Sequence, residues 1–185
     1  MSDKLLHSCE KCLVVWKNFK TLSNEELRLV DQNRYEASFR PGEIIFKQGS
    51  PANSAVFLAT GIAKIYIEGL EGRNFILDLA LPSNLILGPG VLVSNRNSFS
   101  VSALSFVQAC FINLEIINLL IRQNPAFAIG MLEDQGVKSF LVHNKLVSLT
   151  QKKMPGRIAE AILFLSEKVF RDDEFDLLLS RQELG

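Results

Sequence analysis

The middle of the chain alternates apolar and polar positions with a period of two, which is typical of half-buried β-strands. Five short runs rich in β-branched and aromatic residues lie between residues 37 and 113: EIIFKQGS, SAVFLATG, IAKIYIEG, RNFILDLALP and FSVSALSFVQACFIN. Glycine and proline separate these runs, as they do in turns. The pattern predicts a mainly β fold with added helices, built on an antiparallel jelly roll or barrel.

Both flanks of this region follow a helical period instead. Residues 1–34 read as helical, and Ser23 followed three positions later by Glu26 is a capping box. After the strands, one helix is predicted over 114–122 and a much longer one over 125–153. A helix of about 28 residues is more than twice the usual length, which favours packing along a partner.

A coiled-coil frame on the long helix predicts the face that would meet a second copy of the chain. Glycines would allow two helices to approach closely, and a buried asparagine would fix their register. The alternative is a helix buried against the barrel of its own chain. The predicted dimer interface consists of Gly130, Val137, Phe140, Leu141, Asn144 and Val147.

The end of the chain predicts three further elements. Pro155 ends or bends the long helix, and another helix follows over 156–170. Residues 175–179 alternate as in a strand, and Ser180 with Glu183 forms a second capping box. Because a helix of one turn does not sustain itself, we expect the natural protein to continue beyond the last residue.

Charge and composition narrow the classes of function. The 20 basic and 20 acidic residues cancel, so the whole chain lacks the electrostatic signature of a nucleic-acid or anionic-membrane binder. No apolar run approaches the roughly 18 residues of a membrane span. We therefore expect a cytoplasmic protein without a membrane partner, and its three cysteines do not make a disulfide framework.

An enzyme of the cupin type is the alternative from a different class, because it combines a β-barrel with a metal held by several histidines and a carboxylate. The chain has only two histidines, His7 and His143, and neither falls in a predicted strand. The ligand set therefore cannot be assembled, and no nucleophile–base arrangement is visible. We expect no enzymatic activity.

The order of helix, jelly roll, long helix and C-terminal helices resembles the CRP/FNR family of bacterial transcription regulators across essentially the whole chain. The closest signatures are GRIA at 156–159 and RQELG at 181–185, and the second opens a helix-turn-helix in the family. The stretch FRPGEIIFKQGSPANSAVFLATGIAKIY is similar to the family's first barrel strands.

The resemblance implies a homodimeric sensor with a cyclic-nucleotide-binding-like jelly roll, a double-stranded β-helix. Residues 1–34 would form an N-terminal helical segment, 35–122 the sensor barrel with its flanking helix, 123–154 the dimerisation helix, and 155–185 the beginning of a winged-helix domain. In the full-length protein that domain would bind DNA and act with RNA polymerase. It would start at Ser180, Arg181, Gln182 and Glu183.

A second interpretation retains the predicted barrel but assigns the protein no DNA binding. Cyclic-nucleotide-binding-like regulatory or interaction modules share the jelly roll and lack the GRIA and RQELG signatures. The residues that follow position 185 would discriminate between the two, because a transcription regulator requires a turn and a second helix there.

The stretch LILGPGVLVSNRNSFSVSAL, residues 85–104, matches the loop with which cyclic-nucleotide-binding relatives hold a ribose through Glu and a phosphate through Arg. Pro89 stands in place of the glutamate and Asn97 in place of the arginine, while Arg96 is one position away. Losing a charge-assisted partner costs about 1.5–3 kcal/mol, so we do not expect cyclic AMP in the usual mode. The effector stays unknown, and the candidate pocket residues are Gly88, Pro89, Asn97, Ser98, Val142 and His143.

The oxygen-sensing branch of the family holds an iron–sulfur cluster with three N-terminal cysteines and one in the barrel. Cys9 and Cys12 match two of the first set, Cys110 matches the barrel cysteine, and Asn18 stands where the third is expected. Because four thiolates are the norm, a cluster is an alternative that we do not favour over a buried, apolar Cys110. Haem bound by His143 is likewise not favoured over a polar residue at the dimer interface.

Overall fold

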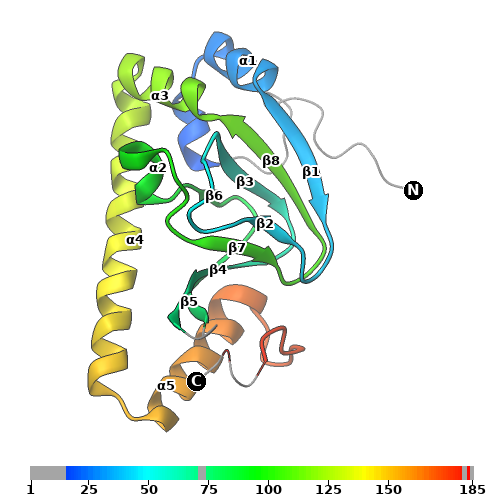
Figure 1. Cartoon of the computed structure of the whole chain (residues 1–185), viewed down its shortest axis with the longest axis vertical. Helices are drawn as coiled ribbons and strands as arrows, with labels where there is room; N and C mark the ends of the chain where they lie inside the picture. The colour runs from blue at the N-terminus through cyan, green and yellow to red at the C-terminus, as the bar shows by residue number, and fades with distance from the viewer. Residues whose placement is uncertain (1–15, 71–73, 181–182, 184–185) are drawn as a thin grey trace.

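The structure is a computed structural model that describes residues 16–70, 74–180 and 183. Two four-stranded antiparallel sheets, ordered β1-β8-β3-β6 and β2-β7-β4-β5, face each other and form the predicted jelly roll (Figure 1). The strands are β1 (Arg34–Phe39), β2 (Ile44–Phe46), β3 (Ser54–Thr60), β4 (Ala63–Glu68), β5 (Asn74–Ala80), β6 (Leu85–Ile86), β7 (Ser100–Ala103) and β8 (Val107–Asn113).

The space between the two sheets is filled by side chains of alternate strand positions, because successive residues of a strand point to opposite faces. Leu58 and Val101 are fully buried there, one from each sheet. The cluster also contains Ile45, Val56, Ala63, Ala80, Ile86, Phe99, Ala103, Val107, Ala109 and Phe111.

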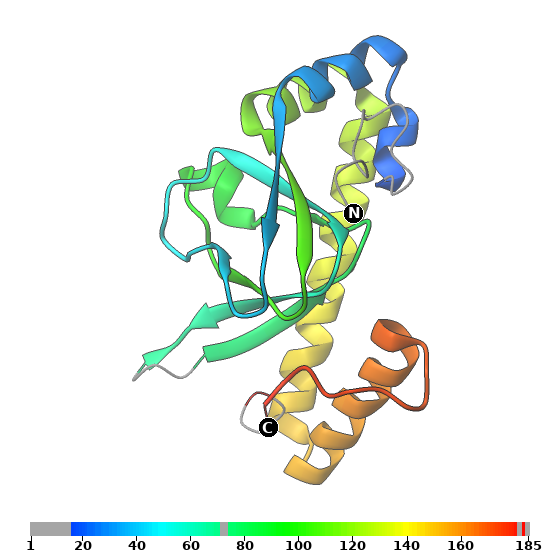
Figure 2. The ribbon, with the colours of Figure 1, turned by 90° about the vertical axis from the view of Figure 1, so that its right-hand side faces the viewer.

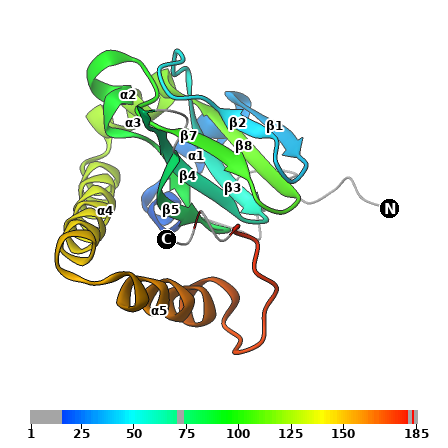
Figure 3. The same cartoon turned by 60° about the horizontal axis from the view of Figure 1, so that its bottom comes forward.

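The helices lie on the outer face of sheet β1-β8-β3-β6 and along one side of the barrel. They are η1 (Lys17–Thr21), α1 (Asn24–Gln32), α2 (Pro89–Ser94), α3 (Leu114–Gln123), α4 (Pro125–Gln151), α5 (Met154–Phe164) and η3 (Leu165–Phe170). Figure 2 shows α4 standing beside the barrel, with its C-terminal end extending past the sheets to the point where α5 begins. From there α5 turns back beneath the β4–β5 side of the barrel (Figure 3).

A second apolar core joins the N-terminal segment, α3 and the start of α4 to the outer face of sheet β1-β8-β3-β6. Phe127 is fully buried at its centre, and its ring meets that of Trp16 edge-on at 5.7 Å. Phe19 packs between Trp16 and Phe57 of β3. The first turns of α4 are therefore anchored by apolar packing.

Local expectations and structure agree at the first helix and at the long one. Ser23 and Glu26 form both hydrogen bonds of the capping box, at 3.3 and 2.7 Å. The long helix α4 has 27 residues. Pro155 lies in the first turn of α5, where its missing N–H costs nothing.

One local prediction is wrong, and two features were not predicted. The strand predicted over 175–179 is irregular chain, because a strand needs a hydrogen-bonded neighbour and no described strand lies beside it. The phosphate-loop stretch contains the short helix α2. The barrel also starts earlier than the period indicated, since β1 begins at Arg34.

None of the helices within the described residues is long and apolar enough to cross a membrane.

Candidate functional site

The segment from Gly88 to Ser98 begins where side chains pack closely on the Gly88 backbone. Gly88 is buried, and a Cβ there would lie 2.8 Å from Ser98 Oγ and 3.0 Å from the Phe99 ring, so a larger residue would force these side chains to shift. Pro89 follows at the first turn of α2 and is exposed. Because proline has no N–H, the turn lacks one of the amide donors with which a phosphate cradle is built.

Asn97 ties this segment to the turn at Gly49 and Ser50. Its Nδ2 donates to Ser50 Oγ at 3.0 Å, its N–H donates to Ser50 O at 3.0 Å, and its carbonyl accepts from Gly49 N–H at 2.8 Å. The side chain is buried. Asn97 therefore holds the loop in place, and its amide brings no charge to an effector.

The neighbouring arginine does not replace the missing cation. Arg96 is exposed, and its Nη1 donates to Gly49 O at 2.6 Å. Ser98 Oγ is buried and has no hydrogen-bond partner among the described residues. Within this segment, then, the buried polar groups at Asn97 and Ser98 are uncharged, and the one positive charge, on Arg96, is exposed and bonded to the Gly49 carbonyl.

Positive charge comes instead from α4. Lys138 Nζ donates to Leu85 O at 3.0 Å, and Lys145 Nζ donates to Ile76 O at 2.6 Å and to Leu77 O at 3.3 Å. Sequence reasoning missed both lysines. Their seven-residue spacing on one face of a long helix was the signal that could have found them.

Asp78 of β5 is the acidic group of this cluster. Burial raises the pKa of its carboxyl group, against the opposing effects of the Leu79 N–H and of the two lysines. Burial also lowers the pKa of Lys138, which Asp134 and Asp78 oppose, and the pKa of Lys145, which Asp78 and Glu160 oppose. All three charges are thus held in a poorly hydrated junction between barrel and helix.

The two predicted pocket positions on α4 lie on different sides of the helix. Val142 follows Lys138 by four residues and precedes Lys145 by three, so it shares their face, and it is 44% exposed. His143 is exposed and lies about 140° round the helix from Lys138. The structure therefore brings Val142 toward the barrel and does not bring His143 there.

The opposite side of α4 is an exposed apolar face. Phe140 and Val147 are 73% and 51% exposed and stand one above the other. Val137, Leu141 and Asn144 of the predicted interface are exposed as well. Phe140, Asn144 and Val147 form the outer face of α4, with Val137 at its edge. Leu141, in contrast, follows Lys138 by three residues and lies on the side of the lysines.

Gly130 is a correction to the predicted interface. It is buried against the chain's own N-terminal segment, where a Cβ would lie 2.5 Å from Asn18 Oδ1. Asn18 Nδ2 in turn contacts Asp134 Oδ2 at 3.5 Å. The glycine is needed for this contact within the chain, and it is not available to a second copy.

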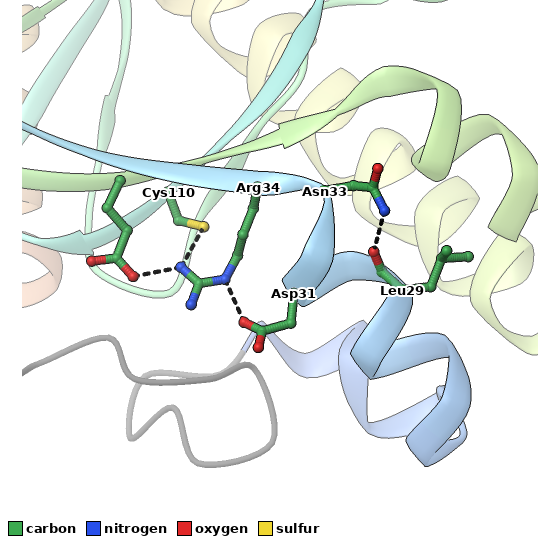
Figure 4. Close-up of polar contacts among 6 residues, drawn as sticks. Leu29, Asp31, Asn33, Arg34 and Cys110 are labelled. Carbon is green, nitrogen blue, oxygen red and sulfur yellow. Dashed lines mark hydrogen bonds and ion pairs between the residues drawn. The ribbon is translucent and has the colours of Figure 1, made fainter.

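Cys110 lies in β8 beside a charged cluster at the end of α1 (Figure 4). Its Sγ is 3.5 Å from Arg34 Nη1, and Arg34 also pairs with Asp31 at 2.8 Å and Glu36 at 2.5 Å. Burial opposes the charge of Arg34, but the hydrogen bonds to Glu36, Asp31 and Cys110 outweigh it and raise the pKa of the guanidinium. Cys110 is itself buried.

The described donors do not fit an iron–sulfur cluster. At the position of the expected third cysteine, Asn18 offers an amide that packs on α4, and an amide is not the thiolate ligand that such clusters use. Residues 16–70, 74–180 and 183 contain no group of three or more His, Cys, Asp or Glu side chains placed to hold a metal. Cys9 and Cys12 lie outside the described residues.

The start of the predicted DNA-binding domain contacts the barrel. Glu183 forms an ion pair with Lys64 of β4, and its second oxygen accepts from Ser180 N–H at 2.9 Å and Ser180 Oγ at 2.8 Å. Burial opposes ionisation of Glu183, but Lys64 and Ser180 outweigh it and lower its pKa. Arg181 and Gln182 lie outside the described residues.

Known proteins match both the barrel and the flanking helices. Residues 36–124 match the family model of the cyclic nucleotide-binding domain. The chain is 22% identical over 190 residues to the transcriptional activator protein FnrL of Cereibacter sphaeroides, covering 98% of this chain and 75% of that protein. It is 26% identical over 150 residues to the transcriptional activator protein Anr of Pseudomonas aeruginosa, covering 79% and 61%.

A solved structure shares the fold. FixK2 from Bradyrhizobium japonicum superposes with a TM-score of 0.73 at 18% identity, over 82% of this chain and 75% of that one. The chain thus spans between about three fifths and three quarters of the length of these relatives. The chain therefore contains a match to the cyclic nucleotide-binding domain and is similar, over most of its length, to transcriptional activators of the CRP/FNR type.

Proposed function

We propose that this protein is a signal-responsive transcription regulator that acts as a homodimer. In this proposal residues 35–122 sense an effector and 123–154 form the dimerisation helix. Residues 155–185 begin a winged helix that binds DNA and acts with RNA polymerase, and residues 1–34 are an N-terminal helical segment. Such a regulator works in the cytoplasm and catalyses no reaction.

The observation that carries the proposal is the two-sided helix α4. One side holds the barrel through Lys138 and Lys145, and the other exposes Phe140 and Val147. At its end Ser148 Oγ donates to Glu160 of α5 at 2.5 Å, and Lys152 pairs with Glu160 at 3.0 Å. A helix placed in this way would join barrel, partner and C-terminal segment, and relatives that match 98% and 79% of this chain are named as transcriptional activators.

Selection from a random DNA pool tests the proposal, with the protein expressed from its complete gene. We expect enrichment of a two-fold symmetric site whose half-sites lie about 10–10.5 bp apart, or a multiple of that spacing. Arg181→Ala should weaken binding to that site, while Arg122→Ala, an exposed arginine of α3, should not. Enrichment of no sequence would overturn the proposal in favour of a regulatory module without DNA binding.

A further inference from the structure

The C-terminal half of α4 lacks the apolar anchoring of its start. Phe127, Gly130 and Met131 are buried at the beginning of the helix, and after Met131 its only buried residue is Ser148, which bonds α5. The hydrogen bonds that the described residues of this half make to the barrel come from Lys138 and Lys145, two turns apart on one face.

The two lysines hold the parts of the barrel that border the effector segment. Lys138 bonds the carbonyl of Leu85, three residues before Gly88, and Lys145 bonds two successive carbonyls of β5. The Lys145 ammonium also lies 5.3 Å from the centre of the Phe75 ring, within the range of a cation–π contact. One helix face thus holds both β5 and the strand that leads into the segment.

The carboxylates that interact with the two lysines come from the chain itself. Asp78 stands opposite Ile65 in the register of β4 and β5, on the face that lines the barrel interior, and it interacts with both lysines. Asp134 and Glu160 interact with one lysine each. Asp134 also pairs with Lys17 at 2.7 Å and Glu160 with Lys152 at 3.0 Å, so Asp78 is the carboxylate that the two lysines share.

We propose that Lys138 and Lys145 form a built-in clamp that holds α4 on the barrel without a bound nucleotide. This inference deepens the proposed function, since it concerns the regulation of the same sensor barrel. In this chain the junction between barrel and helix is closed by two side chains and three backbone carbonyls. An effector that acts here has to displace ammonium groups from carbonyls.

Hydrogen exchange measured by mass spectrometry tests the clamp in Lys138→Met, Lys145→Met and the double variant. In the double variant the backbone amide hydrogens of β5 and of residues 83–87 should exchange at least about tenfold faster than in wild type, because the helix no longer holds these segments. Those of β8 should exchange at the wild-type rate. Lys153→Met, an exposed lysine just past α4, is the matched control and should leave all rates unchanged. Repeating the series with Phe140→Glu added to every variant, which should prevent dimerisation, tests whether the protection arises within one chain.

Acetylation of the wild-type chain by limiting acetic anhydride avoids any dependence on the variants folding. An accessible lysine with a lowered pKa would react faster than Lys153, because more of it is free amine. If the clamp encloses Lys138 and Lys145, both should instead react about tenfold more slowly than Lys153. Fast acetylation of either lysine, or unchanged exchange in the double variant, overturns the clamp. Neither measurement involves DNA, so failure of the regulator proposal would leave their outcome intact.

Discussion

Asn97 and Glu26 are side chains whose partners decide what they do. Asn97 occupies the position of a phosphate-binding arginine, yet both its backbone and its amide are engaged with Gly49 and Ser50. Glu26 completes the capping box of α1 and also accepts from Asn124 Nδ2 at 3.1 Å, which links α1 to the start of α4. Its charge therefore supports the junction between these two helices.

Glu26→Gln should remove a stability that depends on pH. The hydrogen bond from Ser23 N–H comes first among the effects that lower the pKa of Glu26, so the folded chain favours its ionised form. A carboxyl group whose pKa is lower in the folded chain stabilises the fold at pH values above its pKa in the unfolded chain, which is about 4. This stabilisation is lost as the pH falls through the pKa in the folded chain. Urea unfolding should thus show the variant less stable than wild type at pH 7 and the two closer near pH 3.

Glu25→Gln is the matched control for this prediction. Glu25 is exposed, sits in the same first turn, and makes none of the described hydrogen bonds. If both variants lose the same stability at pH 7, the capping interaction is not the source of the effect.

At the scale of the element, α4 combines two functions on opposite faces. Phe140 lies two residues, or about 200°, further round the helix than Lys138, so barrel contacts and the outer face do not compete. Ile129 and Leu132, 57% and 72% exposed, extend the apolar surface toward the start of the helix. A surface of this kind on a long helix is typical of an interaction site.

Phe140→Glu should convert a dimer of this chain into a monomer. A carboxylate at the centre of a helix–helix interface would have to be buried without a partner, which such interfaces do not tolerate. Sedimentation velocity over a range of concentrations measures the effect. Ser139→Glu adds the same charge about 100° away on an exposed position and should remain dimeric. A wild-type chain that sediments as a monomer would contradict the prediction.

At the scale of the whole molecule, the β4–β5 hairpin is contacted from two directions. Lys145 of α4 bonds the carbonyls of Ile76 and Leu77, while Glu183 of the C-terminal segment pairs with Lys64. Lys64 stands opposite Leu79 in the register, next to Asp78. The hairpin thus contacts both α4, the proposed dimerisation helix, and the C-terminal segment that begins the proposed DNA-binding domain.

Cyclic AMP should leave the thermal stability of the chain unchanged. A ligand that binds only the folded state stabilises it by about 2.7 kcal/mol at 100 times its Kd, which would raise the melting temperature by several degrees. Differential scanning calorimetry with cyclic AMP at about 1 mM tests this. The variant Phe127→Ala is the positive control, because it should lower the free energy of unfolding by about 3–5 kcal/mol and so lower the melting temperature. A clear upward shift with cyclic AMP would show that Asn97 is no obstacle.

Local pattern by itself determined the jelly roll, the capping box at Ser23 and Glu26, the length of α4 and the apolar positions Phe140 and Val147. These features depend on periodicity and on neighbours within a few residues, which a sequence displays directly. Only the tertiary structure decided that Gly130 faces Asn18, that Arg96 turns to Gly49, and that Lys138 and Lys145 reach the barrel. Each of these contacts joins residues at least 47 positions apart, and their pairing is set by how the sheets and α4 pack.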